Sequence, residues 1–297
     1  MTEFVQASAR VRHPRLQSTN GFIRGSLFVA LGLLGVGCSA VVDAGRVQCS
    51  VDADCTKRGA EFANATCVAS VCQALNPWSC AEHAPIATTS KAPVSVELTV
   101  MDAIAQTPLV GTSASLCKKL DFECTSPVAR AMSDVAGTVH FDITPMFDGF
   151  VELKTEGYDS AMMFLPPTVE SVHLGVLPLT TVESIGLLGA SLGKTLMPGM
   201  GRVLTTAIGC DKQPAGGVTV SVEGDMGDEV VQFYAVGGVP TFAANATDES
   251  GFGGFFNMKP GQVTLSGTLE DGTPVGRAGF FTRPDFVSFR RIQPWTD

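Results

Sequence analysis

The chain has 297 residues, of which 45% are hydrophobic and 16% are charged, and its formal net charge is −9 at pH 7. This length suggests about two domains, and the hydrophobic fraction is sufficient for a packed core. The charged fraction lies below the ~25% of an average soluble domain, and 32 Gly with 17 Pro favour short strands and turns over long helices. The acidic balance argues against nucleic acid as a partner, because nucleic acid requires basic patches.

The first 37 residues have the pattern of an export signal. Four arginines precede the apolar run SLFVALGLLGVG at 26–37, which is shorter than the ~20 residues that cross a bilayer and has the length of a signal-peptide core. Cys38 follows at once, and LLGVGC resembles a bacterial lipobox, although Gly35 stands where Leu is usual. The resemblance implies lipidation of Cys38 and a membrane contact through that lipid. The alternatives are an ordinary cleaved signal, with secretion, and a buried hydrophobic hairpin.

Eight of the nine cysteines follow Cys38, and in an exported chain disulfides are the default interpretation. The first four fall within a segment too small to bury a core, so that crosslinks must hold it. Zinc is the alternative, but no CxxC pair occurs and His83 lacks a partner at ligand spacing. The spacing does not fix the connectivity. The pairing that we expect is Cys49 with Cys67, Cys55 with Cys72, Cys117 with Cys124 and Cys80 with Cys210.

Alternation of apolar and polar residues predicts the strands. Residues 73–92 are rich in Pro, Ala, Ser and Thr and are predicted to be a linker. From there PVSVELTV at 93–100 alternates as a half-buried strand does, and the pattern recurs at 139–143, 218–222 and 262–265. Short strands separated by turn residues predict an all-β sandwich fold.

Three short motifs occur twice in the same order. Ser-Asp-x-x-Gly-x-x-x-Phe at 133–141 matches Thr-Asp-x-x-Gly-x-x-x-Phe at 247–255. Pro-x-x-Gly lies before each copy, and Gly-x-Val-x-Leu lies after each, at 108–111, 214–217, 149–153 and 261–265. Such a repeat indicates two copies of one domain.

The repeated Asp-x-x-Gly is interpreted as a structural turn. An Asp side chain accepts hydrogen bonds from backbone N–H groups two residues on, and Gly supplies positive φ. We therefore expect Asp134 with Gly137, and Asp248 with Gly251, to form matching turns. A calcium site is the alternative, but neither loop offers a run of carboxylates.

The three motifs together resemble the carboxypeptidase-regulatory, transthyretin-like domain, over roughly 93–180 and 197–293. The resemblance implies a seven-stranded, Ig-like or prealbumin-like β-sandwich in each copy and no chemistry. CSVDADC with CVASVC, and CKKLDFECTSPVARAMSDVAG with FDGFVELKTEGY, are similar to segments of myxobacterial lipoproteins. The expected organisation is a lipoprotein signal peptide (1–37), a Cys-rich segment with linker (38–92), a first sandwich (93–180), a short helical linker (181–196) and a second sandwich (197–297).

A short helix is expected at about 182–192, with Thr180 and Glu183 at capping-box spacing and Gly193 as its stop. Two catalytic patterns overlap its end. Gly-x-Ser-x-Gly at 189–193 resembles a nucleophile elbow, but Pro198 follows where a helix is needed. Gly-Lys-Thr at 193–195 resembles the end of a phosphate loop, but no helix can follow it either.

Few residues in the sequence support other candidate sites. Intradiol dioxygenases share a related sandwich and hold iron with two Tyr and two His, for which the chain offers Tyr158, Tyr234, His140 and His173. Sugar-binding sandwiches need exposed aromatics, but Trp78 falls in the predicted linker and Trp295 at the end of the chain. The phenylalanines Phe280, Phe281, Phe286 and Phe289 are predicted to fill the second core.

We therefore expect a non-catalytic cell-envelope lipoprotein, at the outer membrane because Ser39 and not Asp follows the cysteine. Its sandwiches would bind or space a protein or polysaccharide partner, with no cofactor, metal or catalytic residue. The rival interpretation is an accessory or degenerate enzyme domain, dioxygenase-like or carbohydrate-binding.

Overall fold

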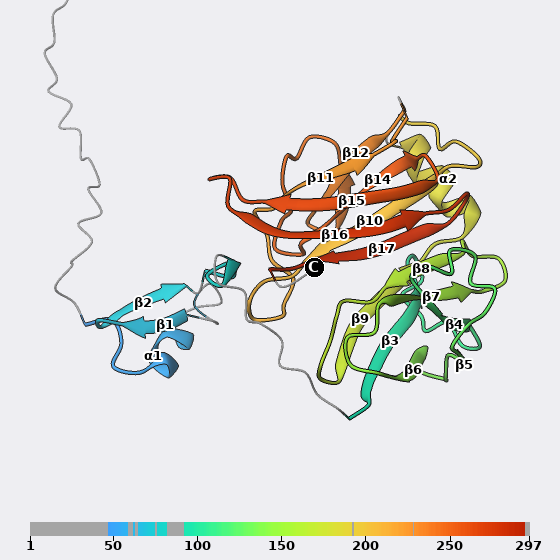
Figure 1. The fold of residues 1–297 in the computed structure, drawn as a ribbon. Coiled ribbons are helices and arrows are strands. Elements are labelled where there is room, and N and C mark those ends of the chain that lie inside the picture. The colour runs from blue at the N-terminus through green and yellow to red at the C-terminus, as the bar shows by residue number, and fades with distance from the viewer. Residues whose placement is uncertain are drawn as a thin grey trace, which may run out of the picture. The chain divides into compact units, whose positions relative to one another are not determined.

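The computed structural model describes residues 47–58, 62, 65–74, 76–81, 92–191, 193–227 and 229–294. The predicted signal peptide, Cys38 and Trp295 lie outside these residues. The described chain is nearly all β, in a small Cys-rich module at 48–74 and two β-sandwiches (Figure 1). No helix in this part of the chain is long and apolar enough to cross a membrane.

The Cys-rich module has little regular structure of its own. It contains the short helix α1 (Asp52–Thr56) and a hairpin of β1 (Ala65–Val68) and β2 (Val71–Ala74). The Cys49–Cys67 disulfide joins the start of the module to β1, and Cys55–Cys72 joins α1 to β2. Its buried cluster consists almost entirely of these cysteines with Ala65, so the crosslinks stand in for a hydrophobic core.

Sandwich 1 consists of seven described strands: β3 (Val94–Asp102), β4 (Ser113–Lys118), β5 (Ala129–Met132), β6 (Thr138–Ile143), β7 (Gly149–Lys154), β8 (Ala161–Phe164) and β9 (Val172–Leu179). One sheet has the order β6-β3-β9, and the facing strands run β8-β7-β4-β5. In β3 the alternate residues Val94, Val96, Leu98 and Val100 are buried, as the alternation predicts. They meet the inward residues of β4, β7 and β8 in one core.

Sandwich 2 follows the helix α2 (Val182–Ser191) and has eight described strands: β10 (Gly201–Ala207), β11 (Thr219–Gly224), β12 (Val231–Val236), β13 (Val239–Thr241), β14 (Phe252–Met258), β15 (Gly261–Thr268), β16 (Pro274–Thr282) and β17 (Val287–Ile292). The sheet β11-β15-β16 faces the strands β13-β12-β14-β10-β17. The four alternating segments predicted from sequence thus correspond to β3, β6, β11 and β15.

The two sandwiches share one sheet. Strand β17 pairs in parallel with β8, which joins the strands of both sandwiches into a nine-stranded sheet, and Figure 1 shows β17 beside β8 where the sandwiches meet. In β8, Ala161 and Met163 belong to the core of sandwich 1, whereas Met162 and Phe164 belong to that of sandwich 2. Both faces of this strand are therefore buried.

The two sandwiches have equivalent topology at their centres. Strands β3 and β10 each pair antiparallel with one neighbour, β6 or β14, and parallel with the other, β9 or β17. They differ at the edge, since β5 pairs with β4 whereas its counterpart β12 pairs with β14. Sandwich 2 also has an eighth strand, β13, paired with β12, whereas the resemblance implied seven strands in each copy. The Cys117–Cys124 disulfide joins Cys117 of β4 to Cys124 in the connection from β4 to β5. It therefore holds this connection against β4.

Two details differ from the sequence expectations. The cap of α2 is Thr181, whose hydroxyl accepts a hydrogen bond from the Ser184 N–H at 3.1 Å; the hydroxyl of Thr180 turns instead to Asp159. Phe289 packs into the core of sandwich 1 rather than that of sandwich 2, because its strand β17 borders both.

Candidate functional site

The first repeated turn lies between β5 and β6. The N–H groups of Ala136 and Thr138 donate to Oδ1 of Asp134, at 2.9 and 2.8 Å. The Gly137 N–H donates to the Asp134 carbonyl, which closes the turn, and Gly137 has a φ of +75°. The carboxylate thus fastens its own turn, in the manner expected of an Asp side chain in this position.

The second repeated turn, between β13 and β14, is built in the same way. The Ser250 N–H donates to Oδ1 of Asp248 at 2.9 Å, and Gly251, with a φ of +64°, donates to the Asp248 carbonyl. The other carboxylate oxygen accepts a bond from the Gly237 N–H at 2.8 Å. These donors, the Ser250 hydroxyl foremost, lower the pKa of Asp248. Asp248 therefore also fixes the hairpin between β12 and β13.

Glycine is required at both turns because the backbone comes close. A Cβ at Gly137 would lie 2.4 Å from the Val100 carbonyl oxygen, and one at Gly251 would lie 2.4 Å from that of Ala207. The carbonyls of these two glycines accept hydrogen bonds from the Val100 and Ala207 N–H groups. Each turn is therefore pinned to the central strand region of its own sandwich.

The residue before each Asp braces the Pro-x-x-Gly turn. The Ser133 hydroxyl accepts a bond from the Thr112 N–H at 2.9 Å, and the Thr247 hydroxyl accepts one from the Val218 N–H at 3.1 Å. Both hydroxyl-bearing side chains are buried. Two of the repeated motifs, Pro-x-x-Gly and Asp-x-x-Gly, thus contact each other through the backbone of their own sandwich, which accounts for their joint recurrence without a ligand.

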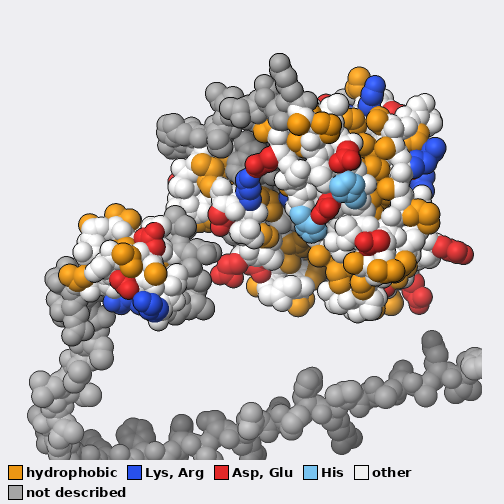
Figure 2. Space-filling model, turned by 90° about the horizontal axis from the view of Figure 1, so that it is seen from below, with side chains coloured by type: hydrophobic (Ala, Val, Ile, Leu, Met, Phe, Trp, Pro, Cys, Tyr) orange, Lys and Arg blue, Asp and Glu red, His pale blue; other side chains and the backbone are white. Residues whose placement is uncertain are grey.

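His140 and His173 lie on the exposed face of the sheet β6-β3-β9. They flank Glu97 of β3, which is the register partner of both. His140 Nδ1 lies 3.3 Å from Glu97 Oε1, and His140 Nε2 lies 3.3 Å from Asp142 Oδ1. Figure 2 shows the two histidines, in pale blue, at the surface among acidic side chains.

The tyrosines of the dioxygenase alternative are engaged elsewhere. The Tyr158 hydroxyl donates to Asp102 at 2.6 Å, which raises the pKa of Tyr158. Tyr234 is buried in sandwich 2, where its hydroxyl accepts a bond from the Val220 N–H at 2.9 Å. The two tyrosines thus serve different cores.

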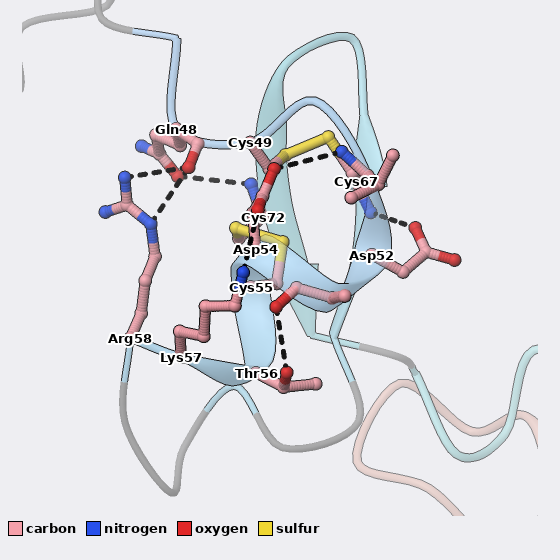
Figure 3. The surroundings of a disulfide bond; sticks show 12 residues. Gln48, Cys49, Asp52, Asp54, Cys55, Thr56, Lys57, Arg58, Cys67 and Cys72 are labelled. Atoms are coloured by element: carbon pink, nitrogen blue, oxygen red, sulfur yellow. Dashed lines mark hydrogen bonds and ion pairs between the residues drawn. A yellow bond between two sulfur atoms is a disulfide. The ribbon is translucent and has the colours of Figure 1, made fainter.

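One group of three potential metal ligands is close enough to share an ion among the described residues: Cys49, Cys55 and Cys72. Each of these sulfurs belongs to a disulfide, as Figure 3 shows. The proximity therefore reflects two adjacent crosslinks rather than a zinc site.

The fourth described disulfide fastens residues 76–81 to sandwich 2. It joins Cys80 to Cys210, and the Trp78 indole Nε1–H donates to the Gly216 carbonyl at 2.9 Å. Trp78 is buried in the core of sandwich 2, so it is not available to stack a sugar, and the predicted linker contains a docked segment. The four disulfides have the pairing expected from the sequence.

The two catalytic patterns lie in the wrong structural context. Ser191 is the last residue of α2, and the next element is the strand β10. A nucleophile elbow needs the opposite order, a strand followed by a helix. The Gly-Lys-Thr sequence at 193–195 follows the helix instead of preceding one, so the geometry of a phosphate loop is not formed.

A groove lies between β9 and the outer face of β10, β14 and β17. Its lining includes two arginines of β17, the buried Arg290 and the half-buried Arg291. Of the groove's residues, His173 was a candidate ligand from sequence, and Pro214, Ser250 and Phe252 fall within repeated motifs that were interpreted as structural. The arginines of the groove were not predicted, because the lining comes from segments far apart in the chain.

Neither a family model nor a curated protein matches this chain. Among solved structures, similar chains include the Bacillus anthracis TIE protein, at 14% identity and a TM-score of 0.26 over 68% of this chain and 34% of that chain. The shaft pilin spaA from Lactobacillus rhamnosus GG has 12% identity and a TM-score of 0.23, over 68% of this chain and 98% of the pilin chain. The minor pilin GBS52 of Streptococcus agalactiae has 12% identity and a TM-score of 0.23, over 67% of this chain and 94% of the pilin chain. The first match thus spans about a third of the TIE chain, and all three likenesses are too weak to bear on function.

Proposed function

We propose that the protein is a non-catalytic lipoprotein of the bacterial cell envelope, anchored at the outer membrane through Cys38. Its two fused sandwiches form a rigid unit that holds a protein or polysaccharide partner away from the membrane. The carboxypeptidase-regulatory, transthyretin-like resemblance of each copy supports a modular, non-enzymatic role.

The observation that carries this proposal is the oxidation state of the cysteines. All eight cysteines within the described residues are paired in four disulfides. Stable disulfides are rare in reducing compartments and common in exported proteins. This supports an exported chain, and the lipobox-like LLGVGC then gives the export signal a cysteine on which to end.

The repeated motifs support the scaffold role. Residues that recur in both sandwiches, including Asp134 and Asp248, bond to the backbone of their own turns. The side-chain oxygens of these residues therefore hold the connections between strands in place. The parallel pairing of β8 with β17 then fixes one sandwich against the other, which suits a spacer.

The anchor is tested with Cys38→Ser in cells labelled with palmitate. The wild type should incorporate label and sediment with the outer membrane, and the variant should do neither. Ser39→Ala, which leaves the cysteine in place, serves as the matched control and should behave as the wild type. Unlabelled wild type, with a C38S variant that stays in the membrane fraction, would refute the anchor.

A further inference from the structure

The groove between β9 and sandwich 2 has the size of a ligand site. Its volume is about 670 Å³, within the ~300–1,000 Å³ typical of small-molecule pockets. The floor is the outer face of β17, β10 and β14, where Arg291, Thr206 and Phe252 stand opposite one another in a row. Phe289 and Leu204 form the next row, so the floor is apolar beyond the arginine.

The end of the groove at Arg291 is shaped by a β-bulge. In the pairing of β3 with β9, Leu174 and Gly175 together oppose the single residue Leu98, and Gly175 has a φ of +76°. A bulge takes a residue out of the regular ladder, and here the Leu174 carbonyl accepts a hydrogen bond from the Arg291 guanidinium. Because Gly175 has no side chain, the backbone beside the guanidinium stays open.

Arg291 has more donors than acceptors at this position. A guanidinium carries five N–H donors, and the Leu174 carbonyl is the acceptor that the described residues give it. Burial lowers the pKa of Arg291, which means that the surroundings disfavour the cation. An anionic partner would favour the charged form of this half-buried cation, because an opposite charge nearby offsets the cost of desolvation.

The ionisable side chains that line the groove are all basic. His173, Lys212, Arg290 and Arg291 contribute to the groove, and none of its lining residues is Asp or Glu. Two of these cations are already engaged, since Lys212 pairs with Glu170 and Arg290 donates to the Leu165 carbonyl. In a chain with a formal charge of −9, a groove whose lining carries basic but no acidic side chains favours an anion over a cation.

We propose that this groove binds a long-chain carboxylate, with its head paired to Arg291 and its alkyl chain lying over Leu204 and Phe252. Arginine matches a carboxylate with two parallel hydrogen bonds, and the apolar floor covers the chain. The inference goes beyond the proposed scaffold role and does not depend on Cys38, because all the lining residues of the groove belong to the two sandwiches and their loops.

The test is calorimetric titration of the purified protein with decanoate, 1-decanol and acetate below their aggregation concentrations. Decanoate should bind at one site, and Arg291→Gln should weaken it about tenfold or more, as expected for a lost charge-assisted pair. Binding of decanol, which lacks the charge, should change little. Arg277→Gln is the matched control, since Arg277 is an exposed arginine of β16 paired with Glu223, and it should bind decanoate as the wild type does.

A second variant tests the same site without changing Arg291, so that a folding defect in R291Q cannot account for the result. Thr206→Trp fills the groove floor while keeping the arginine, and it should abolish binding of decanoate and decanol alike, with an unchanged thermal melt. Equal decanoate affinity in the wild type and R291Q, or undiminished binding to T206W, would overturn the proposal. So would preference for a peptide with an apolar C-terminal residue over decanoate, which would assign the site to a chain terminus.

Discussion

At the scale of single residues, the two Asp turns have the same structural role, one in each sandwich. Asp134→Ala and Asp248→Ala should each lower the free energy of unfolding by about 1 kcal/mol, the usual cost of a lost backbone cap. Each variant removes an acceptor for two backbone N–H groups, at Ala136 and Thr138 or at Ser250 and Gly237. Urea denaturation gives the two values.

The control for these variants is Asp142→Ala, which removes an exposed carboxylate paired with His140 and should change stability little. Melts with and without calcium distinguish the structural interpretation from a metal loop. A calcium-dependent shift in the wild type that is absent from either Asp variant would contradict it.

The contact between Tyr158 and Asp102 predicts a pH dependence. The Tyr158 hydroxyl, with the N–H groups of Ala105 and Ile104, lowers the pKa of Asp102. A carboxyl whose pKa is lower in the folded state adds stability above its unfolded pKa of ~3.9, and this is lost as pH falls through the folded value. Tyr158→Phe should therefore be less stable than the wild type at pH 7, and the difference should shrink below ~3.9. Denaturation at several pH values measures it, and a constant difference would mean that the hydroxyl acts through packing alone.

At the scale of elements, the segment 76–81 acts as a strap on sandwich 2. Cys80 and Cys210 are 130 residues apart, whereas Cys117 and Cys124 are seven apart. Loop entropy in the unfolded chain then predicts a loss of about 4–5 kcal/mol for the double variant C80A/C210A and about 2.5 kcal/mol for C117A/C124A. Chemical denaturation of both variants tests the order, and a larger cost for the short loop would show that the strap adds nothing through chain entropy.

The sequence predicts these elements unevenly, for physical reasons. Strand β3 alternates because one of its faces meets solvent, and so it is found from its pattern. Strand β8, Ala161–Phe164, is buried on both faces and shows no alternation, so its pairing with β17 leaves no local signal. The Asp turns are predictable because their hydrogen bonds are local. Arg291 is not, because its setting comes from Leu174 and the bulge of a distant strand.

At the scale of the whole molecule, the shared sheet should make the sandwiches unfold together. Phe164 of β8 lies 5.0 Å from Phe281 of β16 between ring centroids, and Phe150 of β7 lies 5.3 Å from the same ring. Calorimetry should therefore show one transition for the two sandwiches, with equal calorimetric and van't Hoff enthalpies.

Two core variants test this coupling. Leu98→Ala affects only the core of sandwich 1 and Leu265→Ala only that of sandwich 2, and each should cost about 2–5 kcal/mol. Either variant should move the entire transition to lower temperature. A split into two peaks, with only one of them displaced, would show that the sandwiches are independent.

The Cys80–Cys210 crosslink also decides how the protein responds to mechanical load. Tension applied between residue 76 and residue 294 passes from Cys80 directly to Cys210 and does not enter the chain between them, which contains the whole of sandwich 1. At about 3.4 Å per residue, the 130-residue loop conceals about 440 Å of extended chain. Under pulling, the oxidised protein can therefore lengthen only by unravelling strands β11–β17, and reduction of this one bond would release the hidden length.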